Sequence, residues 1–463
     1  MTKSVFMSAA EQMRAELGPA LCLAKWQQVS LHLPTGLNNS CYHPPLHRIE
    51  VDKLIDNPSA LHNTEHKKIQ RKIMLKNERP GECQYCWNIE NNDQLSDRHY
   101  RSGEPWAARH FTKIKNSTGN EDVIPSYVEV NFNHACNLKC SYCSPQFSST
   151  WHDEIQRMGP YPTDPPHNSP DHFTGTRRPI PSREHNPYVD AFWRWWPELY
   201  PNLDHFRMTG GEPLMDPNTY RVFDYVLEHP SEHLHLNVTS NFSVEDKIFE
   251  KYLDYLKRLC DQDNKKLEHF MQYVSLDSTF NQAEYIRHGL NFERLWNNVN
   301  RFLAEVPNRS SLTFIITMNN LNVTGFQSLI NAIHGLRQIY SKTYQRVWFD
   351  TPILYKPEWQ SIQLLPESYE DNLEHAWAFM LKHIETPENP YKGFKDYELQ
   401  RLDRLIDWMR QGKTLSDEYV KKQKANFYRF FSEHDRRRNT NFLQTFPEME
   451  EFFRQCKYFS ESL

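Results

Sequence analysis

The feature that most constrains the fold is an alternation of strand-like and helix-like segments between residues 123 and 366. Strands that alternate with helical patterns predict an α/β protein with a parallel sheet. Six such units suit a partial (β/α)6 barrel of the TIM type better than a complete eight-fold barrel. The strand candidates are residues 126–133, 205–213, 233–241, 272–278, 311–319 and a last segment within 346–354.

Two further regions flank this core, as expected for a chain of 463 residues. Residues 1–122 carry four cysteines and little regular periodicity, and residues 367–463 have helical patterns. Within the core, residues 152–190 contain eight prolines. Proline is not tolerated in helix interiors or central strands, so we expect a long surface loop there, which would suit a lid.

Composition excludes several classes of protein. No segment is apolar enough for a membrane helix, and the first residues carry charges where a signal peptide would be apolar, so a cytoplasmic protein is expected. The net charge of -5 provides no overall basic field for nucleic acid. Nine cysteines, an odd number with clustered spacing, argue against a disulfide framework and for metal binding.

Cys136, Cys140 and Cys143 follow directly after the first predicted strand. Thiolates bind iron well, and a [4Fe–4S] cluster usually takes four of them. A motif that supplies three leaves one iron open to a further ligand. Taken alone, the same residues would also suit structural cysteines or part of a zinc site.

Two more motifs stand near predicted strand ends. Gly210-Gly211-Glu212 ends the second strand, where the glycines permit close backbone approach and Glu212 offers an acceptor for an ammonium group. Arg287 follows the fourth strand and suits a carboxylate partner. Each has an ordinary structural alternative, a turn for the first and a surface ion pair for the second.

Together these residues resemble the radical S-adenosylmethionine (SAM) superfamily, whose C-x-x-x-C-x-aromatic-C triplet is matched with Tyr142 in the aromatic place. The resemblance implies a partial barrel that holds an oxygen-sensitive [4Fe–4S] cluster and SAM at its C-terminal mouth. It also implies that Gly211 and Glu212 hold the SAM amino group and Arg287 its carboxylate, with Gly210 beside them at the cofactor site. The positions implied to lie near the ribose are Ser240, Asn241 and Ser275.

The first region is similar to the auxiliary-cluster region of twitch/SPASM-type radical SAM proteins, placed here before the barrel. The resemblance implies a second [4Fe–4S] cluster on Cys22, Cys41, Cys83 and Cys86. Tyr42 stands where many relatives have another cysteine. A Cys₄ zinc site is the alternative, because the same ligands suit both metals.

The resemblance implies an enzyme that cleaves SAM reductively and removes a hydrogen atom from a substrate. We expect a peptide or protein side chain as substrate, with a sugar, nucleotide or other small metabolite as the alternative, and flavodoxin or ferredoxin as electron donor. An alternative function of another class is a protein that has an N-terminal zinc site and binds nucleic acid through a basic tail. That tail contains Lys421, Lys422, Lys424, Arg429 and Arg436-Arg437-Arg438.

Overall fold

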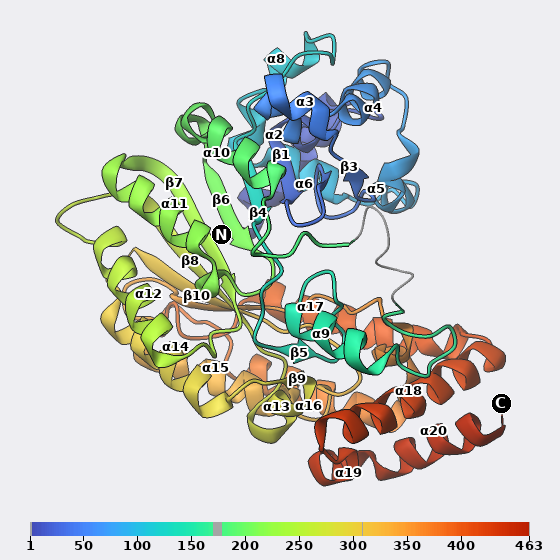
Figure 1. The fold of residues 1–463 in the computed structure, drawn as a ribbon. Coiled ribbons are helices and arrows are strands. Elements are labelled where there is room, and N and C mark those ends of the chain that lie inside the picture. The colour runs from blue at the N-terminus through green and yellow to red at the C-terminus, as the bar shows by residue number, and fades with distance from the viewer. Residues whose placement is uncertain (1, 170–177, 308, 463) are drawn as a thin grey trace.

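A nine-stranded, mostly parallel sheet forms the centre of the protein. The structure is a computed structural model that describes residues 2–169, 178–307 and 309–462. The strand order is β11-β10-β8-β7-β6-β4-β1-β2-β3 (Figure 1). All six predicted strands occur, parallel to their neighbours and in chain order, with helices between them. This arrangement confirms the α/β class with a mostly parallel sheet and is consistent with the expected partial barrel.

The strands are β1 Gln28–His32, β2 Leu37–Asn39, β3 His47–Arg48, β4 Tyr127–Asn131, β5 Lys139–Cys140, β6 His205–Thr209, β7 Ser231–Ser240, β8 Leu267–Ser275, β9 Arg287–His288, β10 Ser310–Ile315 and β11 Val347–Asp350. The helices between the core strands are α9 Ser149–Met158, α10 Pro187–Leu199, α11 Pro217–Glu228, α12 Asp246–Leu259, α13 Phe280–Ile286, α14 Phe292–Glu305 and α15 Phe326–Tyr340.

Local sequence signals explain where these helices begin. The Asp216 side chain accepts a hydrogen bond from the backbone N–H of Asn218, and Pro217 takes the first position of α11. Proline is favoured there because that position donates no intrahelical hydrogen bond. The strands bury their alternate apolar residues under these helices, as Phe206 and Met208 of β6 illustrate.

The N-terminal region is mainly helical and is continuous with the central sheet. Its helices are α1 Thr2–Glu16, α2 Ala24–Gln27, α3 Val51–Asp56, α4 Glu65–Leu75, α5 Gln84–Glu90, α6 Asp97–Gly103, α7 Pro105–Ala108 and α8 Phe111–Lys115. β1 pairs in parallel with β4, and β2 and β3 extend the sheet in antiparallel fashion. The region therefore extends the edge of the barrel sheet, which its weak periodicity did not indicate.

The expectation that residues 152–190 exclude helix is wrong at both ends of that segment. Helix α9 continues to Met158, because the first proline of the segment is Pro160 and the Ser148 side chain caps the helix. Helix α10 begins at Pro187, where the Asn186 side chain caps it. Residues 170–177 of the expected loop or lid lie outside the described residues.

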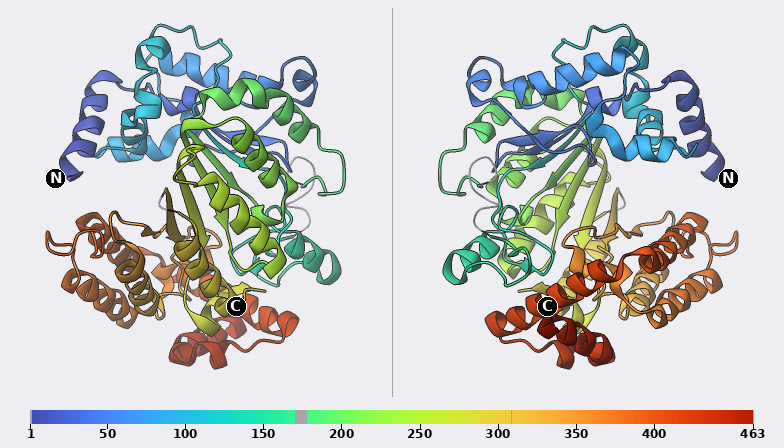
Figure 2. Two further views of the ribbon diagram at one scale, coloured as in Figure 1. Left: turned by 90° about the vertical axis from the view of Figure 1, so that its left-hand side faces the viewer. Right: turned by 90° about the vertical axis from the view of Figure 1, so that its right-hand side faces the viewer.

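The C-terminal region is helical, as expected, and shares the main hydrophobic core with the barrel. Its helices are α16 Glu370–Lys382, α17 Asp396–Arg410, α18 Asp417–Arg438, α19 Phe442–Thr445 and α20 Glu450–Ser462. Figure 2 shows these helices at the opposite end of the molecule from the N-terminal helices. Among the described residues, no helix is both long and apolar enough to cross a membrane.

Candidate active site and a second cysteine group

The loop after β4 carries Cys136, Cys140 and Cys143 at the carboxyl end of the parallel sheet. Burial raises the pKa of all three thiols, and the charges of neighbouring cysteines raise it further for Cys136 and Cys143, the latter to about 12. The buried core thiols of Cys260 and Cys456 show the same shift, so it does not by itself mark a metal site. Three thiols on one loop are nevertheless the donors that an iron–sulfur cluster takes.

A short backbone pairing brings Arg287 to the cysteine loop, because Cys140 of β5 is the register partner of Arg287 of β9. The Arg287 Nη1 atom lies 3.5 Å from the Cys140 Sγ atom, and Nη2 lies 2.5 Å from the Tyr142 hydroxyl. A guanidinium that donates to a ligand sulfur stabilises its thiolate form and tunes a bound metal.

Asp277 completes this network and was not identified from the sequence. Its Oδ2 atom lies 2.9 Å from Arg287 Nε and accepts a 2.7 Å hydrogen bond from the Tyr142 hydroxyl. Asp277 is fully buried, so its charge needs the guanidinium. Its position two residues after β8 is the sequence signal that could have identified it, since carboxyl ends of parallel strands meet at one mouth.

The Gly210-Gly211 pair packs against the cysteine loop. A Cβ atom on Gly211 would lie 2.2 Å from the backbone oxygen of Ala135, the residue before Cys136. Gly210 has a φ of +123°, and a Cβ there would lie 2.1 Å from Asn131 Oδ1. The backbone at these glycines therefore lies close to the protein's own chain, at the end of β4 and at the cysteine loop.

Glu212 is buried beside two of the predicted ribose contacts. Its carboxylate accepts hydrogen bonds of 2.8 Å from the Ser240 hydroxyl and 2.8 Å from the Asn241 backbone N–H. Burial raises the pKa of Glu212 to about 7, although these hydrogen bonds and one from the Leu214 N–H oppose the rise. Ser275, the third predicted ribose contact, ends β8 beside Ile315 of β10.

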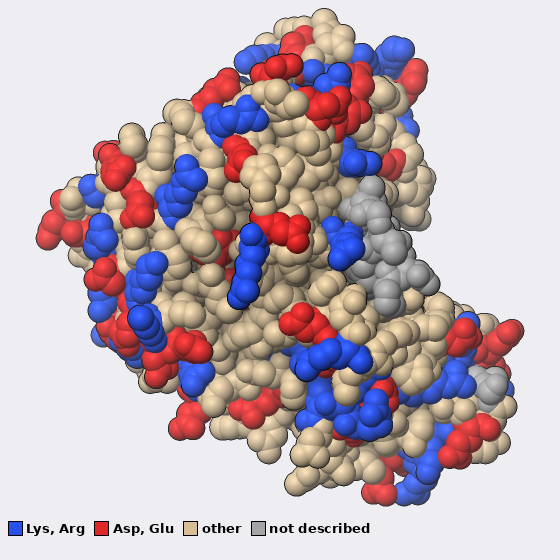
Figure 3. Space-filling view, in the orientation of Figure 1, with Lys and Arg blue, Asp and Glu red and all other residues tan. Residues whose placement is uncertain are grey.

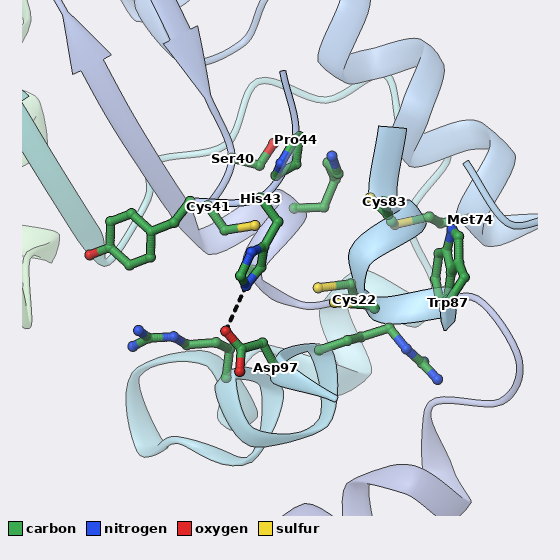
Figure 4. A pocket seen from close by; sticks show the side chains of 15 residues that line it. Cys22, Ser40, Cys41, His43, Pro44, Met74, Cys83, Trp87 and Asp97 are labelled. Atoms are coloured by element: carbon green, nitrogen blue, oxygen red, sulfur yellow. Dashed lines mark hydrogen bonds and ion pairs between the residues drawn. The ribbon is translucent and has the colours of Figure 1, made fainter. Parts of the chain in front are cut away.

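The structure brings together the four N-terminal cysteines that were predicted to share a site. Cys22, Cys41, Cys83 and Cys86 line one cavity in the N-terminal region. Figure 4 shows Cys22, Cys41 and Cys83 around the same space, with His43 bonded to Asp97 beside them. Burial, together with the charge of Cys22, raises the pKa of Cys83 and of Cys86 to about 12.

Positive charge lies next to this cysteine group. Lys25 is buried, forms an ion pair with Glu82, and its ammonium lowers the pKa of both Cys41 and Cys83. Lys67 of α4 is also buried, and burial together with the charges of Arg71 and Lys25 lowers its pKa well below the usual range of a lysine. The Lys25 ammonium therefore is the positive charge that favours a metal–thiolate centre with net negative charge.

Among the described residues, no group of three or more His, Cys, Asp or Glu side chains is arranged to hold one metal ion. This finding is the same for both cysteine groups, so it does not favour iron over zinc at the N-terminal cysteines.

The basic tail is not a free positive surface. The side chains of Arg437 and Arg438 are 2% and 0% exposed, and both contact Glu154 of α9. Arg436 pairs with Glu433, and Lys422 pairs with Asp164. Figure 3 shows Lys and Arg interspersed with Asp and Glu over the face that it displays. These contacts bury or pair part of the basic tail.

A comparison with known protein families gives a match over the residues of this site. The family model described as the Radical SAM superfamily matches residues 130–333, from β4 into α15. The matched segment contains the cysteine triplet, Glu212, Asp277 and Arg287, so the chain contains a radical SAM superfamily domain.

Among solved structures, Streptococcus suis SuiB bound to the precursor peptide SuiA matches with a TM-score of 0.33 and 13% identity, over 80% of this chain. The present chain covers 65% of that chain, somewhat less than two thirds of its length. No curated protein matches the sequence.

Proposed function

We propose that this chain is a radical SAM enzyme that cleaves SAM reductively and removes a hydrogen atom from a substrate. The observation that carries the proposal is the cysteine loop at the carboxyl end of β4, where Arg287 contacts Cys140 and Gly211 packs against Ala135. The matched radical SAM domain covers the whole of this arrangement. A [4Fe–4S] cluster held by Cys136, Cys140 and Cys143 would supply the electron for cleavage of SAM to methionine and a 5′-deoxyadenosyl radical able to take a hydrogen atom.

The residues around the loop have separable tasks under this proposal. Cys136, Cys140 and Cys143 would ligate three irons of the cluster, and the Asp277–Arg287 pair positions Cys140. Glu212 accepts the SAM ammonium group, which would lower the raised pKa of its carboxyl group. Arg287 remains the proposed partner of the SAM carboxylate in addition to its contacts within the protein.

A peptide or protein side chain is the substrate class that we propose. The support is an open cavity of about 390 Å³ between β1, β2 and β4, rimmed by the exposed Tyr42. Sites for free metabolites usually enclose most of the ligand, whereas an open site suits a side chain presented on a longer backbone. A sugar or nucleotide substrate is the alternative.

We also propose a second [4Fe–4S] cluster on Cys22, Cys41, Cys83 and Cys86. Its support is the shared cavity of the four thiols and the buried Lys25 beside them. Four thiolates would leave no iron open, so this centre would transfer electrons or stabilise the fold rather than bind SAM.

The test compares the wild type with a Cys136→Ala/Cys140→Ala/Cys143→Ala variant, both reconstituted anaerobically and given SAM and dithionite. We expect 5′-deoxyadenosine from the wild type only, and an iron content that falls from about eight to about four atoms per chain. A Cys260→Ala/Cys456→Ala variant is the matched control, because both thiols lie in the hydrophobic core. Production of 5′-deoxyadenosine by the triple variant would refute the catalytic assignment. Retention of one zinc and no iron would establish zinc at the second site.

A further inference from the structure

Ser141, the residue that follows the second cysteine of the loop, has all of its polar groups paired. Its backbone N–H donates to the Ile286 backbone oxygen at 2.8 Å. Its hydroxyl donates to Gln360 Oε1 at 2.9 Å, and its backbone oxygen accepts a 3.1 Å hydrogen bond from Gln360 Nε2. Ser141 and Gln360 are both 0% exposed. One buried amide side chain therefore fixes this part of the loop at two points.

The backbone of Gln360 is itself held on both sides. Gln360 ends the short 3₁₀ helix Glu358–Gln360 that follows β11, and its N–H donates to the Pro357 oxygen at 3.0 Å. Its backbone oxygen accepts a 2.9 Å hydrogen bond from the Asn320 N–H. The Asn320 side chain also donates to the Trp359 oxygen at 2.9 Å. A buried polar network in which these groups are satisfied favours one arrangement of the amide.

The two preceding carbonyl groups of the loop are held in the same way. The Lys139 oxygen accepts a 3.0 Å hydrogen bond from Arg438 Nη1 of α18. The Cys140 oxygen accepts a 2.9 Å hydrogen bond from Trp151 Nε1 of α9. Together with Ser141, three consecutive carbonyl groups thus each accept an N–H from a side chain. The path of this segment is therefore set by side chains from other parts of the fold.

Both residues between the second and third cysteines are fixed from outside the loop. Gln360 holds Ser141, and Asp277 accepts a 2.7 Å hydrogen bond from the Tyr142 hydroxyl. The matched radical SAM domain, residues 130–333, contains Asp277 but ends before Gln360. A cluster needs its ligand sulfurs at fixed separations, and contacts behind the ligands supply that order. The chain beyond the matched domain therefore contributes to the geometry of the cysteine loop.

We infer that Gln360 is a positioning residue for the proposed catalytic cluster. By holding Ser141 at two atoms, it sets the relative positions of Cys140 and Cys143. The inference rests on the proposed function, because the cluster is the group that this loop would hold. An apolar side chain could fill the same buried space, but only a group that both donates and accepts fixes the orientation of Ser141.

The experiment compares Gln360→Met with the wild type, each as the full chain reconstituted anaerobically and given SAM and dithionite. Methionine keeps the length of the side chain and removes both hydrogen bonds to Ser141. One readout is the 5′-deoxyadenosine formed per catalytic cluster. The other is the electron paramagnetic resonance signal of the reduced catalytic cluster, identified as the signal that the Cys136→Ala/Cys140→Ala/Cys143→Ala variant lacks. We expect turnover per cluster to fall about tenfold to a hundredfold, as is typical for lost contacts behind metal ligands, and the signal to change.

Gln363→Met is the matched control, because the Gln363 side chain instead donates to the Trp408 backbone oxygen at 3.1 Å. It should keep the wild-type signal and turnover per cluster. A role in folding alone would lower the thermal stability of Gln360→Met and leave both readouts unchanged, and that result would overturn the inference.

Ser141→Ala removes the hydroxyl bond alone, so we expect a smaller loss of turnover per cluster. Added to Gln360→Met, it should cause no further loss, because both changes remove the same contact. Additive losses in the double variant would contradict the inference. Where Gln360→Met does not fold, Ser141→Ala decides the question, and a wild-type signal and turnover in that variant would overturn the positioning role.

Failure of this inference is distinguishable from failure of the proposed function. SAM cleavage by the wild type, with both readouts unchanged in Gln360→Met, would remove the positioning role and leave the radical SAM assignment standing. A wild-type chain that binds the cluster without cleaving SAM would remove the enzymatic proposal, and the resonance signal would still test Gln360.

Discussion

Asp277 and Arg287 form a buried ion pair in which Nε lies 2.9 Å from Oδ2, and this pair connects the end of β8 to the cysteine loop. The carboxylate also accepts a hydrogen bond from the Thr317 backbone N–H beyond β10. One side chain thus joins two strand ends to the residue that holds Cys140. The relationship makes Asp277 a positioning residue for the proposed cluster.

Asp277→Asn should destabilise the cluster-free protein by about 3–5 kcal/mol, because it leaves the Arg287 charge buried without a partner. Urea unfolding measures this change, and the iron content after reconstitution should fall as well. Asp246→Asn is the control, since Asp246 is 84% exposed and its ion pair with Arg294 is long. Equal unfolding free energies for Asp277→Asn and wild type would contradict the assigned role.

Gly211→Ala should impair cluster assembly without touching any cysteine. The new methyl group would meet the Ala135 oxygen at 2.2 Å, so the cysteine loop has to move. Iron content and the visible absorption of the reconstituted protein report the change. Gly335→Ala is the matched control, because nothing lies within 4 Å of that site in α15. There we expect normal assembly and a gain of about 1 kcal/mol in stability.

SAM affinity should fall as the pH decreases through about 7, if Glu212 binds the SAM ammonium group. Burial raises the carboxyl pKa to about 7 in the SAM-free protein, so protonation below that pH removes the charge that attracts the ligand. Between pH 8 and pH 6 we expect about a tenfold loss of affinity. Equilibrium binding across this range provides the measurement.

Glu212→Gln should bind SAM weakly and with a flat pH profile, whereas the exposed Glu198→Gln should behave like wild type. A pH profile for Glu212→Gln that parallels the wild-type profile would assign the titration to another group.

Glu154 should contribute to stability at neutral pH and lose that contribution in acid. Burial alone would raise its pKa, but Arg438, Lys139 and the Tyr161 hydroxyl outweigh it and lower the pKa to about 2. The contribution is therefore present above the usual pKa of 4.5 and is lost as the pH falls through about 2.

Replacing Glu154 with Gln should cost about 3 kcal/mol at pH 7 and little near pH 2, measured by urea unfolding of the cluster-free chain. Glu232→Gln, with a side chain 79% exposed, should show no such difference between the two pH values. A constant cost of Glu154→Gln at both pH values would exclude this electrostatic explanation.

The sequence by itself determined the six parallel strands and the helices between them. Each element depends on the periodicity of its own residues and on caps such as Asp216 before Pro217, which are local interactions. The spacing of Cys136, Cys140 and Cys143 is likewise local, and so it was visible without coordinates.

Only the tertiary structure decided which distant residues meet. The addition of β1 to the edge of β4, the burial of Arg438 against Glu154 and the pairing of Asp277 with Arg287 all depend on that packing. The same is true of the cavity shared by Cys22, Cys41, Cys83 and Cys86. These contacts join residues from separate elements, so no local pattern specifies them. Their energies depend on burial and charge pairing, which exist only once the chain has folded.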